Sequence, residues 1–469
     1  MKVTIGFFFF LGGLGAFLLA NRLTSSKWFG LFGALCFLLT PYLCTNVYVR
    51  GDLSEFAAMM ITPWPCYFVL RAHRMQRFDC QSVFVFVGLT ASLACIICMH
   101  PALALFYTVV FGLFTLGCLD NFEQQKIFLF LVCLAFLSGL VFSSPYWFTV
   151  WRMHDYVDLS RLHQGWFHPT GHLVNPKQFL ASEWKYGASP GGLPLQLGWP
   201  HLLLAIVGMV ANRRQRLMKF AAAMYLGLIL AMTLVGYPLW RYLPLLNFVQ
   251  FPWRLLSVVA LVQLICICGI WLLLATRASS MRHGMLFVLA IVMIILARHQ
   301  FQFESVRDIN AQEILASSQS PFADFRSYAA LDDYLPRTVL ERPSTTRVDD
   351  SMVRAQGKGN VHIESLPGHS PYHPRVRSVT ANDSASVVID QFYFPGTRVL
   401  IDGCKVSPAE ITDRLRNDGR MVVAIPAGSN VVLESYYDGP PGWRLHLLVV
   451  VLWFIALGVI VIFHRRGSS

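Results

Sequence analysis

Long apolar segments recur along this chain and constrain its fold more than any other feature. A lipid-spanning helix needs roughly 20 mainly apolar residues. Only 14% of the residues are charged, against roughly 25% in soluble domains. We therefore predict a membrane all-α bundle of about 11 transmembrane helices. The expected spans lie at 4–21, 28–43, 56–70, 80–99, 101–119, 127–144, 197–211, 220–237, 254–275, 284–298 and 445–463.

The third of these segments is short and contains Pro63 and Pro65. Proline removes a backbone donor and interrupts a helix. Such a break is tolerated at membrane depth only where protein or water covers the freed backbone groups. A kinked or re-entrant helix is therefore expected at 56–70.

Basic residues fall in every second connection between the apolar segments. The formal charge is +12, and Lys and Arg in short loops favour the cytoplasmic side, so no nucleic-acid partner is expected. This orientation places 299–444 outside the cytoplasm and the C-terminus inside. It also places the N-terminus outside, which is unusual for a chain that starts Met1-Lys2. The basic residues are Arg22 and Lys27, Arg71, Arg74 and Arg77, Lys126, Arg213, Arg214, Arg216 and Lys219, Arg277 and Arg282, and Arg465 and Arg466.

The predicted domains follow from the polar stretches. Residues 1–298 form the polytopic membrane domain with a large outer loop at 145–196, and 445–469 form a last helix with a basic cytoplasmic tail. Residues 299–444 form a soluble extracytoplasmic domain. From about 360, period-two runs predict an antiparallel β-sandwich, with Asp402-Gly403 as a hairpin turn. The runs are "NVHIESL", "ASVVIDQFYF", "TRVLIDG", "MVVAIPAG" and "NVVLESYY".

Cysteine and histidine spacing indicates neither a metal site nor a disulfide framework. Most cysteines lie inside apolar segments, and Cys404 is the only one in the soluble domain. The histidines and acids of the 145–196 loop match no compact ligand motif. We expect no metal and no cofactor.

The segment "YVRGDLSEF" places Arg50, Asp52 and Glu55 between two apolar segments. Ionisable residues at membrane depth are functional candidates. In one interpretation a carboxylate acts at the outer interface and Arg50 binds phosphate. In the other, Arg50 and Glu55 pair and anchor the turn between two spans. The sequence leaves both open.

Several motifs in order carry a resemblance to a known family. They are "PYLCTNVYVRGDLSEFAAM", "MHPALALFY", "WKYGASPGGLPLQLGWPHLLLA", "LPLLNFVQFPWRLL" and "DQFYFPGTRVLIDG" with "VAIPAGSNVVLES". Together they resemble the bacterial membrane family labelled 6-pyruvoyl-tetrahydropterin-synthase-related, close to YfhO-like proteins, over roughly 20–463. That family is similar to the GT-C glycosyltransferases, and nothing in the chain resembles a soluble pterin enzyme.

The resemblance implies transfer of a sugar from a polyprenyl-phosphate donor to an envelope glycan or protein acceptor, at the outer face of the bacterial inner membrane. Such chemistry needs a carboxylate as base and cations for the lipid phosphate. The implied catalytic residues are Asp52 and Glu55. The implied substrate-binding residues are Arg50, His100, Trp166, Trp184, Tyr186, Arg241 and Arg254.

One departure from the GT-C pattern leaves an alternative open. GT-C enzymes carry their catalytic aspartate in the first outer loop, and no such acidic loop precedes "PYLCTNVYVRGDLSEF". An N-terminal piece is expected to be absent or supplied by a membrane-protein partner. The alternative is therefore a non-catalytic scaffold or partner subunit in envelope polysaccharide assembly. A transporter is less consistent with the sequence, which shows no internal repeat.

Overall fold

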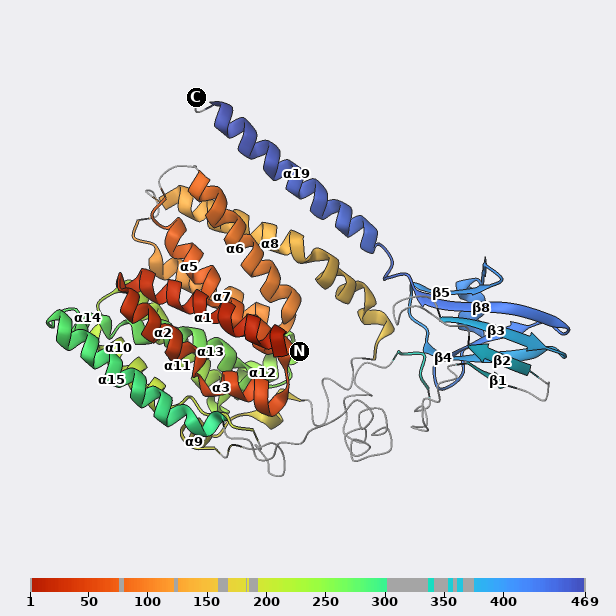
Figure 1. Cartoon of the computed structure of the whole chain (residues 1–469), viewed down its shortest axis with the longest axis horizontal. Helices are drawn as coiled ribbons and strands as arrows, with labels where there is room; N and C mark the ends of the chain where they lie inside the picture. The colour runs from red at the N-terminus through yellow and green to blue at the C-terminus, as the bar shows by residue number, and fades with distance from the viewer. Residues whose placement is uncertain are drawn as a thin grey trace. The chain divides into compact units, whose positions relative to one another are not determined.

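The computed structural model describes residues 2–75, 80–121, 125–158, 168–182, 184, 193–301, 336–340, 353–356, 361–365 and 375–467. The chain divides into two compact units (Figure 1). The first, mainly helical unit comprises Met1–Trp147, Leu162–Val306 and Val450–Ser469. The second comprises Phe148–Arg161 and Arg307–Val449 and contains the β-strands.

The apolar segments form helices close to where hydropathy places them. The longer helices are α1 (Lys2–Thr24), α2 (Lys27–Leu38), α6 (Cys80–Met99), α7 (Pro101–Cys118), α8 (Lys126–Met153), α10 (Trp199–Ala211), α11 (Arg216–Met232), α13 (Leu255–Cys268), α15 (Ser279–Ala297) and α19 (Trp443–Gly467). The shorter ones are α3 (Pro41–Cys44), α4 (Leu53–Ile61), α5 (Pro63–Ala72), α9 (Pro176–Leu180), α12 (Tyr237–Tyr242) and α14 (Trp271–Leu274).

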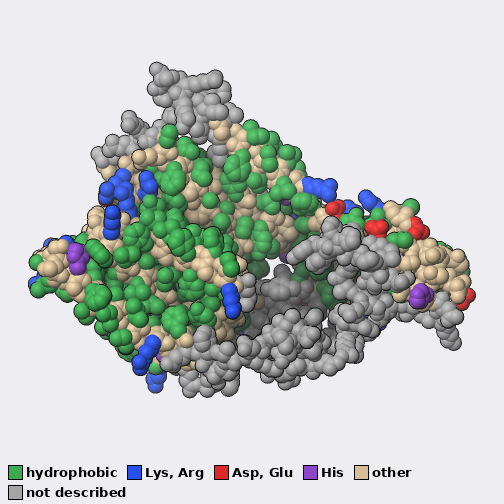
Figure 2. All heavy atoms as spheres, in the orientation of Figure 1, with side chains coloured by type: hydrophobic (Ala, Val, Ile, Leu, Met, Phe, Trp, Pro, Cys, Tyr) green, Lys and Arg blue, Asp and Glu red, His purple; other side chains and the backbone are tan. Residues whose placement is uncertain are grey.

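Not every apolar helix is long enough to cross a membrane. Among the described residues, six helices are, and up to eight spans result if each of two bent helix pairs is one span. The pairs are Lys27–Leu38 with Pro41–Arg50, bent by 50°, and Arg216–Met232 with Leu234–Tyr242, bent by 86°. The expected total of about 11 spans is not confirmed. Figure 2 shows wide apolar areas over the helices, with Lys and Arg side chains in separate patches.

The segment with Pro63 and Pro65 is two helices. α4 ends at Ile61, and α5 begins at Pro63. Proline fits the first turn of a helix because its missing N–H has no helical partner there. Both short helices pack against α1, and Trp64 Nε1 donates to the Leu11 carbonyl at 3.1 Å. The broken backbone is therefore covered by protein, as the sequence requires.

α13 forms the centre of the helical unit. Every residue from Leu255 to Cys268 is buried, which is typical of a helix that is apolar on all sides. Its one long polar side chain, Gln263, donates from Nε2 to the Tyr225 hydroxyl at 2.9 Å. α10 and α11 pack directly on it.

Glycine permits backbone-to-backbone packing between α10 and α13. A Cβ at Gly208 would lie 2.0 Å from the Cys266 carbonyl oxygen, and one at Gly269 would lie 2.3 Å from the Gly208 oxygen. Small residues allow membrane helices to approach this closely.

We therefore expect Gly208→Ala to lower the free energy of unfolding by about 1–3 kcal/mol, because the two helices must separate. Unfolding in detergent measures this change. Gly227→Ala in α11 is the matched control, because a Cβ there meets no atom within 4 Å. Equal stability of the two variants would show that the helices separate without cost.

The second unit contains two antiparallel sheets. One has the order β1-β4-β7 and the other β2-β3-β8-β5-β6. Both contribute to one apolar core that includes Val387, Met421, Val399 and Leu433. The strands are β1 (Val353–Gln356), β2 (Val361–Ser365), β3 (Arg375–Ala381), β4 (Ala385–Phe392), β5 (Thr397–Ile401), β6 (Cys404–Lys405), β7 (Arg420–Ile425) and β8 (Ser429–Tyr437), with α18 (Pro408–Asp413) between β6 and β7.

The five period-two runs correspond to β2, β4, β5, β7 and β8. The hairpin at Asp402-Gly403 is confirmed, because Ile401 pairs with Cys404 and both turn residues have positive φ, 48° and 76°. Strands β1 and β3 were not expected from the sequence. Most of the polar stretch between about 302 and 352 lies outside the described residues.

Candidate functional site

The charged segment lies where a helix ends and the next one begins. α3 continues into a turn of π-helix, η1 (Thr45–Arg50), which ends at Gly51 with φ of 68°. Glycine is favoured in this left-handed position because it has no Cβ. Asp52 then caps α4, and its Oδ1 accepts from the Glu55 backbone N–H at 3.0 Å. The tight reversal brings Arg50, Asp52 and Glu55 together.

Glu55 is fully buried and fully hydrogen-bonded. Its side chain is 0% exposed. Oε1 accepts from the Tyr42 hydroxyl at 2.7 Å and from Asn46 Nδ2 at 3.3 Å. Oε2 accepts from Arg50 NH1 at 2.9 Å. A buried carboxylate is tolerated only with such partners.

Arg50 links the acidic groups of the cluster. NH1 also donates to the Tyr42 hydroxyl at 3.1 Å and to Asn46 Oδ1, and NH2 donates to Asp52 Oδ2 at 2.9 Å. Its guanidinium carbon lies 4.5 Å from the centre of the Trp253 ring, a distance typical of a cation–π contact. Both carboxylates and an aromatic face therefore already engage this guanidinium.

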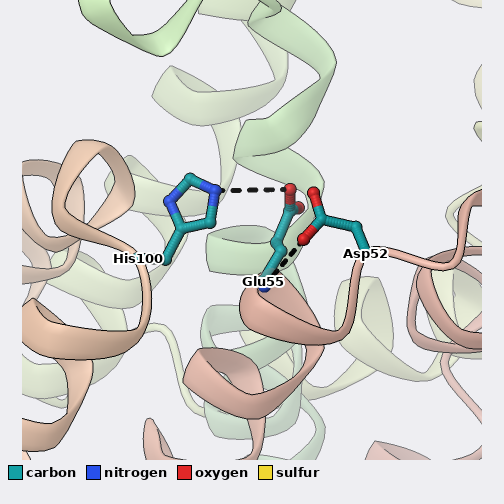
Figure 3. A group of neighbouring side chains, drawn as sticks. All are labelled: Asp52, Glu55 and His100. Atoms are coloured by element: carbon teal, nitrogen blue, oxygen red, sulfur yellow. Dashed lines mark hydrogen bonds and ion pairs between the residues drawn. The ribbon is translucent and has the colours of Figure 1, made fainter. Parts of the chain in front are cut away.

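The rest of the cluster comes from distant parts of the sequence. Arg254, at the end of η9 (Pro252–Arg254), places Nε 3.6 Å from Glu55 Oε2. Its NH1 donates to the Val249 carbonyl at 3.0 Å and to Gln250 Oε1 at 3.3 Å. His100 Nε2 lies 3.9 Å from the same Glu55 oxygen (Figure 3). Glu55 is thus the point where three polar segments meet.

The protonation of His100 follows from its contacts. Its Nδ1 accepts from the Leu103 backbone N–H at 3.2 Å and caps α7. A neutral ring therefore carries its hydrogen on Nε2, which faces Glu55. Burial lowers the pKa of His100 below its ordinary value, although Glu55 acts in the opposite direction.

Asp52 is held in its ionised form. Burial acts to raise its pKa, but the Arg50 guanidinium, the Glu55 N–H and the Ser54 hydroxyl together bring the pKa below its ordinary value. Its side chain remains 20% exposed, against 0% for Glu55. Asp52 is therefore the more exposed of the two carboxylates of the cluster.

The cluster also has the donor set of a cation site. Asp52, Glu55 and His100 each offer one ligand atom, and these atoms lie within 4.8 Å of one another (Figure 3). However, Arg50 bridges the two carboxylates at 2.9 Å, and Arg254 adds a second positive charge. A metal ion would have to displace Arg50, so the geometry does not fit a resident metal.

Four of the five motifs that resembled one family lie close together in the helical unit. "PYLCTNVYVRGDLSEF" supplies Glu55, "MHP" supplies His100 and "QFPWR" supplies Arg254. The motif "LPLQLGW" reaches the same place, because Thr45 Oγ1 donates to the Pro194 carbonyl at 2.9 Å.

The model of the 6-pyruvoyl-tetrahydropterin synthase related domain, a membrane protein family, matches residues 1–306. The chain belongs to this family. The match covers the helical segments that build the cluster, and so it confirms the family expected from the motifs. No curated protein and no solved structure matches the chain.

The remaining predicted site residues of this family member lie elsewhere or outside the described residues. Arg241 is exposed, and its NH1 donates to the Tyr237 hydroxyl at 2.7 Å. Trp184 packs on the helical core with its ring edge-on to His299, 6.2 Å away. Trp166 and Tyr186 lie outside the part of the chain that the structure describes.

Sequence reasoning missed Tyr42, Asn46 and Trp253 as members of the cluster. One signal was present: Tyr42, Asn46 and Arg50 follow one another at intervals of four in an otherwise apolar stretch. Residues four apart lie on one face of a helix, and a line of polar groups there indicates a buried network.

Proposed function

We propose that the chain is a GT-C-like membrane glycosyltransferase, or the C-terminal portion of one. In this proposal it transfers a sugar from a polyprenyl-phosphate donor to a cell-envelope acceptor, and the cluster around Asp52 and Glu55 is the reaction site. The observation that supports it is the partly exposed, ionised carboxylate of Asp52 beside two arginines at a break between helices.

Each group has a role in this reaction. Asp52 accepts the proton of the acceptor hydroxyl as its oxygen forms a bond to the anomeric carbon. The bond from that carbon to the phosphate oxygen breaks, and polyprenyl phosphate leaves with the electron pair. In the described part of the chain, the buried Nε of Arg254 has no hydrogen-bond acceptor. In this proposal the Arg254 guanidinium stabilises the leaving phosphate. Glu55 is a positioning residue, because it is fully buried and orients Arg50.

Reconstitution of the purified chain tests the proposal. The chain is placed in vesicles with a radiolabelled polyprenyl-phosphate sugar and envelope glycan as the acceptor. The expected result is labelled glycan that depends on the chain. The proposal would be contradicted if the chain transfers no sugar alone and if no membrane partner restores transfer.

A non-catalytic scaffold is the second candidate. The contacts of Arg50 favour it, because this guanidinium already has four acceptors inside the protein. In this case Asp52 and Glu55 stabilise the helix break and have no substrate. Such a chain transfers no sugar alone and co-purifies with a membrane protein that supplies a catalytic acid.

The proposed reaction requires a definite orientation in the bacterial inner membrane. We place residues 299–444 on the extracytoplasmic side and the C-terminus in the cytoplasm, because the basic connections then face the cytoplasm. Cys404 is exposed and is the only cysteine of residues 299–444, so it reports on this side.

We expect an impermeant maleimide to label intact spheroplasts that express the chain. Cys404→Ser is the matched control and is expected to remove this label. If labelling appears only after the membrane is permeabilised, Cys404 lies on the cytoplasmic side, and the orientation is the opposite of the one proposed.

A further inference from the structure

Three arginines converge on a cavity in the helical unit away from the cluster. The cavity has a volume of about 410 Å³, within the range of small-molecule sites. Its polar lining consists of Arg22, Arg71, Arg74, Asn21, Tyr67 and Gln81. Among the residues that the structure describes, no acidic side chain lines it.

The fold brings these arginines together from two packed helices. Arg22 lies in the last turn of α1, Arg71 lies in the last turn of α5, and Arg74 follows two residues after α5 ends. Helix C-termini favour a cation nearby. That effect explains one arginine at each helix end, but it does not explain three around one cavity.

The three positive charges have no acidic partner in the described part of the chain. Among the residues that the structure describes, no Asp or Glu carboxylate lies within 4.0 Å of Arg22, Arg71 or Arg74. In the described part of the chain, Arg71 NH1 donates to the Tyr67 hydroxyl at 3.2 Å. Like charges around one cavity repel each other, and an anion in the cavity removes that repulsion.

The cavity lies at the opposite end of α6 from the cluster. Gln81 lines the cavity near the start of this helix, and His100 follows its last residue. At 1.5 Å per residue, the two sites are about 30 Å apart, which is the thickness of the hydrocarbon core. If the cluster is at one membrane interface, the arginine pocket is at the other, where lipid head groups lie.

We propose that this arginine pocket binds a phosphate group. Guanidinium groups bind phosphate oxygens with paired hydrogen bonds, and basic pockets between membrane helices bind anionic lipid head groups. The phosphate comes either from an anionic phospholipid of the adjoining leaflet or from a soluble phosphate. The proposal does not depend on the transferase activity.

Native mass spectrometry of the delipidated full chain tests this site with two probes, phosphatidylglycerol and inorganic phosphate. We expect the wild-type chain to retain phosphatidylglycerol. We expect the Arg71→Gln/Arg74→Gln variant to bind it about tenfold more weakly. The control is Arg213→Gln/Arg214→Gln, which removes the same charge from exposed residues outside the pocket. This control is expected to bind like the wild type.

The two probes separate the two sources of phosphate. One outcome is that the wild-type chain binds inorganic phosphate, retains no lipid and loses phosphate binding when Arg71 and Arg74 are replaced. This outcome supports the pocket and identifies its ligand as a soluble phosphate. Equal binding of both probes by the wild type and the variant overturns the proposal. If the double variant does not fold, Arg74→Gln alone repeats the test, because Arg74 is exposed.

Discussion

Replacing Glu55 with Gln is expected to lower the free energy of unfolding of the helical unit by about 3–5 kcal/mol, the range for breaking a buried ion pair by removing one partner. Gln keeps the size of the side chain and one oxygen for the Tyr42 hydroxyl. It loses the charge that faces Arg50 at 2.9 Å and Arg254 at 3.6 Å. Among the described residues, Arg50 then keeps Asp52 as its carboxylate partner, and Arg254 keeps no carboxylate within 4.0 Å.

Asp120→Asn is the matched control for this change. It removes one carboxylate charge from the same unit, but Asp120 is 80% exposed and its ion-pair partner is His73. Exposed pairs contribute about 0–1 kcal/mol. Unfolding in mixed detergent micelles measures both variants. A loss for Glu55→Gln no greater than for Asp120→Asn would mean that water solvates the cluster.

A second substitution distinguishes an uncompensated charge from a loss of shape. Arg50→Gln in the Glu55→Gln background removes the positive charge left behind. We expect the double variant to be more stable than the sum of the two single losses predicts, because the two residues share one ion pair. Strict additivity would show that Arg50 and Glu55 act separately.

Hydropathy could predict where the helices lie but not which of them cross a membrane. α6 has the predicted bounds, because the polar sequence "QRFD" precedes Cys80 and His100-Pro101 follows Met99. α4 and α5 are also mainly apolar, but they have only 9 and 10 residues. A short helix buried in a bundle and a span facing lipid can have similar compositions, so hydropathy alone does not determine the number of spans.

The sequence could predict only the local part of the candidate site. Arg50, Asp52 and Glu55 are neighbours in the chain, and their proximity follows from local structure. The approach of Arg254 and Trp253 to this segment depends on how α13 packs in the bundle, which no local pattern encodes. Strand β3 was missed because its arginine, serine and threonine residues mask the period-two pattern of "RVRSVTA".

Under the proposed glycosyltransferase reaction, Asp52→Asn is expected to lower sugar transfer by about 10²–10⁴-fold, the usual contribution of a general base. Asn cannot accept the proton of the acceptor hydroxyl. It is nevertheless as good a helix N-cap as Asp, so the bond to the Glu55 backbone N–H can persist. The measurement is the transfer rate in reconstituted vesicles, with the melting temperature of the same sample recorded beside it.

Two control variants test whether a loss of transfer in Asp52→Asn is specific to the Asp52 carboxylate. Ser54→Ala removes a hydrogen bond to Asp52 Oδ1 and leaves the carboxylate in place, so most of the activity should remain. Arg213→Gln removes an exposed charge outside the cluster, and the transfer rate should not change. If Asp52→Asn retains full activity with both controls, Asp52 is a helix cap only. The base then belongs to another residue or a partner, and the full burial of Glu55 argues against that residue.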